Sequence, residues 1–212
     1  MKAILEQLYG DFLERELPEL IGRNVNIEPV TGKALALIGM RRTGKTYLCF
    51  QAIRNLIEQG VPKENILYLN FEDDRLYGFQ LSDCQSILDM FNAQQPEKKA
   101  THCWFFFDEI QNIPDWENFI RRVIDTEKAS VYVTGSSAKL LSTEIATGLR
   151  GRALDREVFP YSFEEYLNVK HFDGDLSRLG SKTRLQLANH AQDYCKLGGC
   201  VFTFSHFHLV TF

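Results

Sequence analysis

Apolar residues occur along this chain in two patterns, one typical of buried strands and one typical of amphipathic helices. Short apolar runs predict four buried strands, and a weaker fifth ends at Pro160. These runs cover residues 34–38, 66–71, 103–107, 130–134 and 155–159. Helical spacing predicts helices over residues 1–20, 46–58, 81–91 and 116–125. Residues 25–30, with a turn at 31–33, indicate a hairpin that leads into the first buried strand.

Uninterrupted apolar strands that alternate with amphipathic helices predict a parallel sheet covered on both faces, because each crossover helix must bury its apolar stripe. We therefore expect a three-layer α/β/α domain with a mainly parallel five-stranded sheet. The predicted organisation is an N-terminal helical segment at 1–24, a core at 25–165, a helical region at 166–199 and a tail at 200–212.

Composition narrows this picture only slightly. A chain of 212 residues with 44% hydrophobic residues supports one α/β domain and a small appended element. The formal net charge of −4 argues against a surface that is basic throughout, although local basic patches fit it. No apolar stretch is long enough to span a bilayer, and five cysteines without a CxxC pair fit a reducing compartment. We expect a cytoplasmic protein without a membrane partner.

The segment between the first strand and the following helix has the pattern of a P-loop, GxxxxGK[ST]. Gly39 and Gly44 let the backbone turn its N–H groups toward an anion, Lys45 neutralises phosphate charge, and Thr46 offers a hydroxyl to Mg²⁺. This pattern predicts binding of a nucleoside triphosphate with Mg²⁺. The residues expected to bind the nucleotide are Gly39, Arg42, Thr43, Gly44, Lys45, Thr46 and Tyr47.

Two acids follow the third apolar run. Asp108 is the expected metal residue, together with Thr46, and Glu109 is expected to polarise the attacking water. In isolation such a pair is more often part of a solvated loop, but the P-loop upstream favours the functional interpretation. An acid pair at this point is typical of the additional-strand, catalytic-glutamate class of P-loop proteins.

Two further groups of residues are candidates for catalysis. Ser136 and Ser137 follow the fourth strand, where a polar side chain can contact the γ-phosphate; capping of the next helix explains them equally well. Arg150 and Arg152 lie in a predicted loop, and either arginine could stabilise transition-state charge in its own subunit or in a neighbour. By residue type alone, solvated surface arginines are the commoner case.

Five blocks of this sequence together resemble a prokaryotic family of AAA-type ATPases that carry a C-terminal domain of unknown function. The blocks are GMRRTGKT, NFED, FFFDEIQNIPDWENFIRRV, VTGSSAKLLSTEIATGLRGR and VFPYSFEEYL, and the similarity runs from about residue 20 to about residue 170. The resemblance implies an ATPase with ATP and Mg²⁺ at the P-loop, a serine sensor at 136–137, and a functional role for Arg150 and Arg152. After Gly199 the sequence departs from the family pattern, and we interpret 200–212 as an aberrant or truncated tail.

The resemblance implies a nucleotide-driven switch that acts on an unknown protein partner, with assembly into a homo-oligomer as one arrangement. An alternative is a nucleic-acid-associated regulatory ATP-binding protein of a mobile-element or defence system. Arginine-rich patches at 41–42, 121–122 and 150–152 allow nucleic-acid binding but do not require it. A small-molecule kinase is a third hypothesis, but no acceptor-binding pattern is visible. These alternatives stay open on sequence alone.

Overall fold

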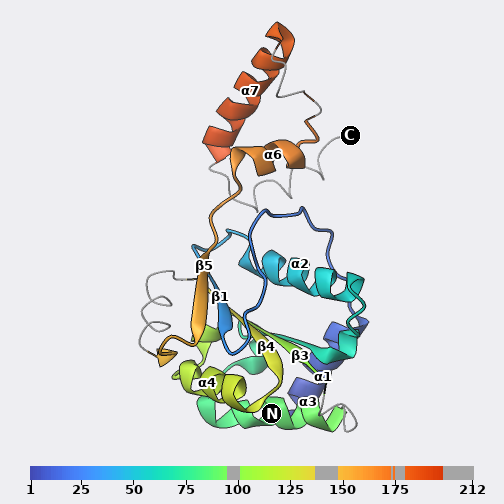
Figure 1. Ribbon diagram of the computed structural model, residues 1–212, viewed down its shortest axis with the longest axis vertical. Helices are drawn as coiled ribbons and strands as arrows, with labels where there is room; N and C mark the ends of the chain where they lie inside the picture. Colours follow the sequence, from blue (N-terminus) through green and yellow to red (C-terminus); the bar gives the residue numbers. More distant parts are fainter. Residues whose placement is uncertain (95–100, 137–147, 173, 175–179, 198–212) are drawn as a thin grey trace. The chain divides into compact units, whose positions relative to one another are not determined.

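The computed structural model describes residues 1–94, 101–136, 148–172, 174 and 180–197 (Figure 1). The chain separates into two compact units. The first consists of Met1–Gly39 and Lys45–Glu157, and the second begins at Val158 and also includes Met40–Gly44. The domain boundaries predicted from the sequence remain predictions.

A five-stranded sheet forms the centre of the first unit, in the order β2-β3-β4-β1-β5. All four strand pairings are parallel. The strands are β1 (Ala34–Ile38), β2 (Ile66–Asn70), β3 (Cys103–Asp108), β4 (Ala129–Gly135) and β5 (Ala153–Glu157). The predicted parallel α/β sheet is confirmed. Strand β4 lies between β1 and β3, which is the additional strand expected of the catalytic-glutamate class.

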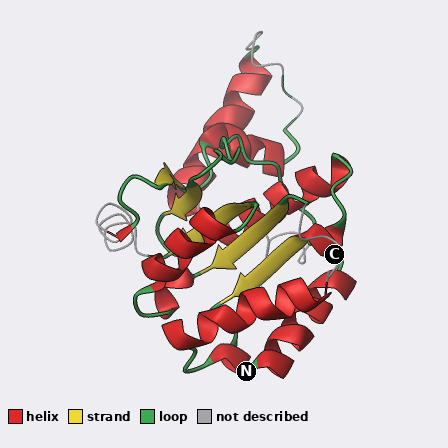
Figure 2. Cartoon of the chain, turned by 60° about the horizontal axis from the view of Figure 1, so that its bottom comes forward, coloured by secondary structure: helices red, strands yellow, loops and turns green. Residues whose placement is uncertain are grey.

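Helices cover both faces of this sheet (Figure 2). They are α1 (Lys2–Glu14), α2 (Lys45–Glu58), α3 (Cys84–Gln94) and α4 (Trp116–Thr126). Short 3₁₀ turns lie at η1 (Lys63–Asn65), η2 (Asp74–Leu76), η3 (Leu81–Asp83) and η4 (Ile110–Asn112).

Aromatic side chains of the strands show how the layers are joined. Phe105 packs edge-on against Phe91 of α3, and Phe107 packs against Phe119 of α4. Phe106 points to the other face because side chains alternate along a strand, and its ring stacks on Tyr132 at 4.3 Å. These rings belong to the buried core. Because side chains alternate along β3, this strand places aromatic rings against helices on one face of the sheet and against Tyr132 on the other.

The opposite face of the sheet is covered by α2, whose Phe50 ring lies 4.9 Å from the ring of Tyr68 in β2. Helix α1 packs beside β2 at the sheet edge: Phe12 also contacts Tyr68, and Tyr9 contacts Phe91 of α3. The predicted N-terminal helix is therefore an integral part of the first unit.

Two local predictions were wrong. Residues 25–30 do not form a strand, because both edges of β1 are already paired, with β4 on one side and β5 on the other. The fifth strand begins at Ala153 rather than at Asp155, since Ala153 pairs with Ala34 and the register of β1 then carries the pairing to Glu157.

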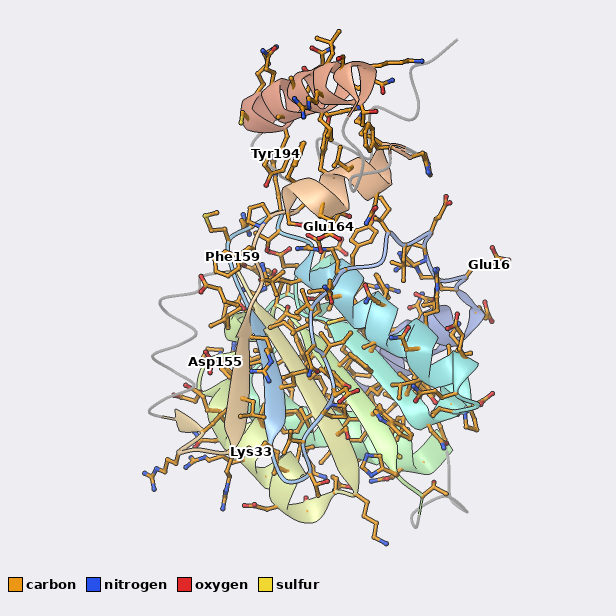
Figure 3. The ribbon with its side chains drawn as sticks, turned by 45° about the horizontal axis from the view of Figure 1, so that its top comes forward. Glu16, Lys33, Asp155, Phe159, Glu164 and Tyr194 are labelled. Atoms are coloured by element: carbon orange, nitrogen blue, oxygen red, sulfur yellow. The ribbon has the colours of Figure 1, made fainter. Side chains whose placement is uncertain are left out.

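The second unit contains α6 (Phe163–Val169) and α7 (Ser181–Leu197). A capping box begins α6: Ser162 accepts a hydrogen bond from the backbone N–H of Glu165, whose carboxylate accepts one from the N–H of Ser162. Tyr194 of α7 reaches toward α6 (Figure 3), where its hydroxyl donates to the carbonyl of Tyr161 at 2.6 Å. The Tyr194 ring also contacts the rings of Phe163 and Tyr166 in α6, so aromatic contacts hold these two helices together.

No helix within the described residues is both long and apolar enough to cross a membrane.

The aromatic core generates a stability prediction. Phe106→Ala should lower the free energy of unfolding by roughly 3–5 kcal/mol, because it removes a fully buried ring that stacks on Tyr132. Urea denaturation followed by circular dichroism measures the change. Tyr77→Ala is the matched control: this side chain is 94% exposed, so its removal should cost less than about 0.5 kcal/mol. Equal losses in the two variants would contradict the assigned core.

Candidate active site

The parallel strands bring the candidate residues to one edge of the sheet. Ile38 at the end of β1 pairs with Gly135 at the end of β4, and Asn70 at the end of β2 pairs with Asp108 at the end of β3. The segments that follow these strands therefore emerge at the same edge, which is where open α/β sheets bind ligands.

The P-loop leaves β1 at Gly39 and turns through two positive backbone angles. Gly44 has a φ of 93°, which a residue without a side chain adopts readily, and Arg42 has a φ of 66°. The hydroxyl of Thr43 is buried and donates to the carbonyl of Met40 at 3.0 Å. Arg42 and Thr43 thus shape the loop locally. Tyr47, on the first turn of α2, is 43% exposed.

Lys45 is a buried cation at the start of α2. Its side chain is 4% exposed, and Nζ donates to the carbonyl of Gly39 at 3.2 Å. The same nitrogen lies 3.8 Å from Oε1 of Glu109. The ammonium group therefore joins the two ends of the P-loop and faces the carboxylate that the sequence marks as catalytic.

Asp108 is fully buried, and three hydroxyl groups surround its carboxylate. Thr46 Oγ1 donates to Oδ2 at 2.8 Å, and the hydroxyl of Tyr68 donates to the same oxygen at 2.9 Å. Thr134 Oγ1 donates to Oδ1. Burial raises the pKa of Asp108 above its ordinary value, while the three hydroxyl groups act in the opposite direction by stabilising the charged form.

Glu109 follows directly but lies in different surroundings. Its φ of 53° puts the residue in the left-handed region, where the backbone of a residue other than glycine is strained. Its backbone N–H donates to Thr134 Oγ1 at 2.9 Å, so the threonine that binds Asp108 also fixes the turn. Oε2 accepts hydrogen bonds from Ser136 Oγ and, at 2.7 Å, from Nε2 of Gln111.

A family model described as an AAA domain matches residues 31–167, which is most of the chain and includes every residue of this site. The chain belongs to the AAA-domain family.

Curated relatives of this AAA-domain chain carry no assigned function. It is 35% identical over 199 residues to the uncharacterized protein MJ1544 of Methanocaldococcus jannaschii, covering 93% of this chain and 42% of that protein. An uncharacterized protein of Haemophilus influenzae is 37% identical over 145 residues, which cover 68% of this chain and 35% of that protein. The chain thus spans less than half the length of these relatives.

Among solved structures, the Aeropyrum pernix ORC1 protein in complex with DNA is similar with a TM-score of 0.46 and 13% identity, over 90% of this chain and 55% of that one.

The two arginines of this AAA domain lie away from its own P-loop. The carbonyl of Arg152 accepts a hydrogen bond from Ala34 at the start of β1, whereas the P-loop follows the end of β1. The guanidinium of Arg152 pairs with Asp125 of α4 at 2.8 Å. Arg150 lies two residues earlier. Arg152 thus lies beside the amino end of β1, and the catalytic roles predicted for Arg150 and Arg152 stay predictions.

The two predicted serines differ in whether the structure describes them. Ser136 Oγ donates a hydrogen bond to Glu109 Oε2, and its role as a sensor stays a prediction. Ser137 and the tail at 200–212 fall outside the described residues.

Three residues of the site were missed by sequence reasoning. In the sequence, Tyr68 resembles one more apolar position of a buried strand. Thr134 resembles the polar end of another strand, and Gln111 resembles part of a loop. One signal was available for Thr134, which lies next to the carboxyl end of its strand, where polar side chains converge. Tyr68 and Thr134 bond to Asp108, which is 40 and 26 residues away along the chain. Gln111 joins its near neighbour Glu109 to Ser136, which is 25 residues away, so only the fold identifies these contacts.

Thr134 generates a prediction about the buried acid. Thr134→Val should lower the free energy of unfolding by roughly 1–3 kcal/mol, because Asp108 loses a donor and the N–H of Glu109 loses its acceptor. Thr134→Ser keeps the hydroxyl and is the matched control. Urea denaturation compares the two, and equal stabilities would show that the hydroxyl does not support the site.

Proposed function

We propose that this chain binds and hydrolyses ATP with Mg²⁺ and uses the cycle as a switch on a protein partner. The convergence of Lys45, Thr46, Asp108 and Glu109 at one edge of the sheet is the observation that carries the proposal. A phosphate-binding cation, a hydroxyl, a buried carboxylate and a second carboxylate are the groups that phosphoryl transfer to water needs. ATP rather than GTP follows from family membership, since no NKxD guanine-reading motif occurs in the sequence.

The oxygen donors of this site fit Mg²⁺. Thr46 Oγ1 and the Asp108 carboxylate lie 2.8 Å apart, and hydroxyl and carboxylate oxygens are the ligands that this hard cation takes. Thr46 would hold the ion directly and Asp108 through its water shell. When Mg²⁺ is bound, the ion neutralises phosphate charge.

Glu109 is the proposed group that accepts the proton of the attacking water. Its Oε1 faces Lys45 at 3.8 Å, so the carboxylate and the ammonium neutralise one another in the absence of nucleotide. Phosphate groups carry more negative charge than one carboxylate and would compete for Lys45. Glu109 would then be released from Lys45 and could face the attacking water when substrate is bound.

Arg150 and Arg152 suit a role toward a second copy of the chain. Their place at the amino ends of the strands supports a charge-stabilising contact in a neighbouring site of a homo-oligomer, the arrangement in which an arginine acts in trans. Within the described residues, Arg121 bonds to Asn118 and Arg122 to Gln85. An interaction with protein is the favoured proposal because the net charge of −4 gives the chain no overall basic surface.

Two substitutions separate binding from turnover. Lys45→Ala should weaken ATP binding roughly 10- to 100-fold, because a charge-assisted contact to phosphate is lost. Glu109→Gln should retain binding and lower the turnover rate by about 10²-fold or more. Isothermal titration and a phosphate-release assay measure these effects, with exposed Lys2→Ala as the control. Turnover equal to wild type in Glu109→Gln would remove that residue from the mechanism.

The trans hypothesis predicts complementation. Arg150→Ala/Arg152→Ala protein and Lys45→Ala protein should each be nearly inactive, the former by about 10³-fold. Mixed oligomers contain sites that take Lys45 from one copy and the arginines from another, so mixing should restore measurable phosphate release. If the mixture stays as inactive as its components while oligomers form, these arginines do not act between subunits.

A further inference from the structure

Gln111 contacts the catalytic glutamate and has no role in the hydrolysis proposed above. It belongs to η4, directly after the left-handed turn at Glu109. Its Nε2 lies 2.7 Å from Glu109 Oε2 and 3.2 Å from Ser136 Oγ. The backbone beneath it is anchored on both sides: Ile110 is fully buried, and Asn112 donates to the carbonyl of Phe71 at 3.1 Å. Gln111 therefore reaches Glu109 from a fixed position.

The protons of this cluster allow one consistent arrangement. An ionised carboxylate only accepts, so Ser136 uses its single proton on Glu109, and the Ser136 oxygen must accept from Gln111. The carboxamide nitrogen of Gln111 has two protons, one for each partner. Glu109 and Ser136 together therefore determine which end of the Gln111 carboxamide faces them.

The other end of the same carboxamide is left unsatisfied. Gln111 Oε1 is buried, and no group in the described part of the chain forms a hydrogen bond with it. Leaving a buried carbonyl oxygen unpaired costs free energy, and a glutamine that served packing alone would have both ends paired. In this orientation Gln111 donates a hydrogen bond to the carboxylate of Glu109, while its own Oε1 forms none within the described residues.

We propose that Gln111 is a positioning residue for Glu109, an inference that rests on the proposed ATP hydrolysis. Its amide holds Oε2, so that Oε1 remains for the attacking water. In that step the water oxygen bonds to the γ-phosphorus, the bond to the β–γ bridging oxygen breaks with its electron pair, and a water proton passes to Glu109. Without Gln111 the carboxylate can rotate away from the line of attack.

The test replaces Gln111 by methionine, which keeps the length and the unbranched shape but removes both donors. Gln111→Met should lower kcat about 10- to 100-fold, the size of effect seen when a hydrogen-bond partner of an active-site ligand is removed. KM and the dissociation constant for ATP should stay within about 2-fold of wild type, because Gln111 contributes to the chemical step and not to binding.

Gln51→Met is the matched control. Gln51 uses both ends of its carboxamide in hydrogen bonds to the backbone of Arg23, at 2.9 and 3.1 Å. Its loss should leave kcat unchanged. A wild-type kcat in Gln111→Met, an equal fall in Gln51→Met, or an effect confined to KM would each overturn the proposal.

A second measurement tests the contact without turnover. Gln111→Met and Glu109→Ala should show non-additive unfolding free energies in a double-mutant cycle on nucleotide-free protein, since each removes the other's partner. Additive values would overturn the positioning role even if kcat falls. If the wild-type chain releases no phosphate, the proposed hydrolysis fails, and this cycle alone decides whether Gln111 holds Glu109.

Discussion

The burial of the Asp108 carboxylate is the constraint on which the rest of this site depends. A charge without solvent is stable only when polar groups replace the lost water, and here three hydroxyl groups do so. They come from α2, β2 and β4, and they lie 62, 40 and 26 residues from Asp108 along the chain. Each element must reach the same edge of the sheet for Asp108 to be satisfied, so folding of the core and assembly of the site are one event.

Glu109 shows how one residue further along the chain produces a different chemistry. The left-handed turn directs its side chain away from the hydroxyl cluster and toward Lys45, Gln111 and Ser136. One acid is thus held by hydroxyls suited to a metal ion, and the other by groups that could exchange partners when phosphate arrives. Thr134 connects the two, because its single hydroxyl donates to Asp108 and accepts from the N–H of Glu109. The strain at Glu109 is balanced by this contact.

The sequence predicted the main architecture well, for a physical reason. Strands buried on both faces must be apolar throughout, and the helices that cover them must be amphipathic, so both leave strong local patterns. The hairpin at 25–30 was wrong because its residues alternate like a strand, while strand formation depends on a free edge that β1 does not have. The fifth strand shifted for a similar reason: its limits follow the register with β1 rather than its own composition.

The sequence by itself determined the P-loop, the acid pair and the parallel sheet, because each is a local pattern with a fixed spacing along the chain. Only the tertiary structure decided which side chains surround the two acids. Tyr68 carries no local signal, since the register of β2 with β3 chooses its partner Asp108. Gln111 reaches Ser136 because β4 lies beside β3. The same register puts Arg152 at the opposite edge. Hydrogen bonds act over about 3 Å in space, whatever the separation in sequence.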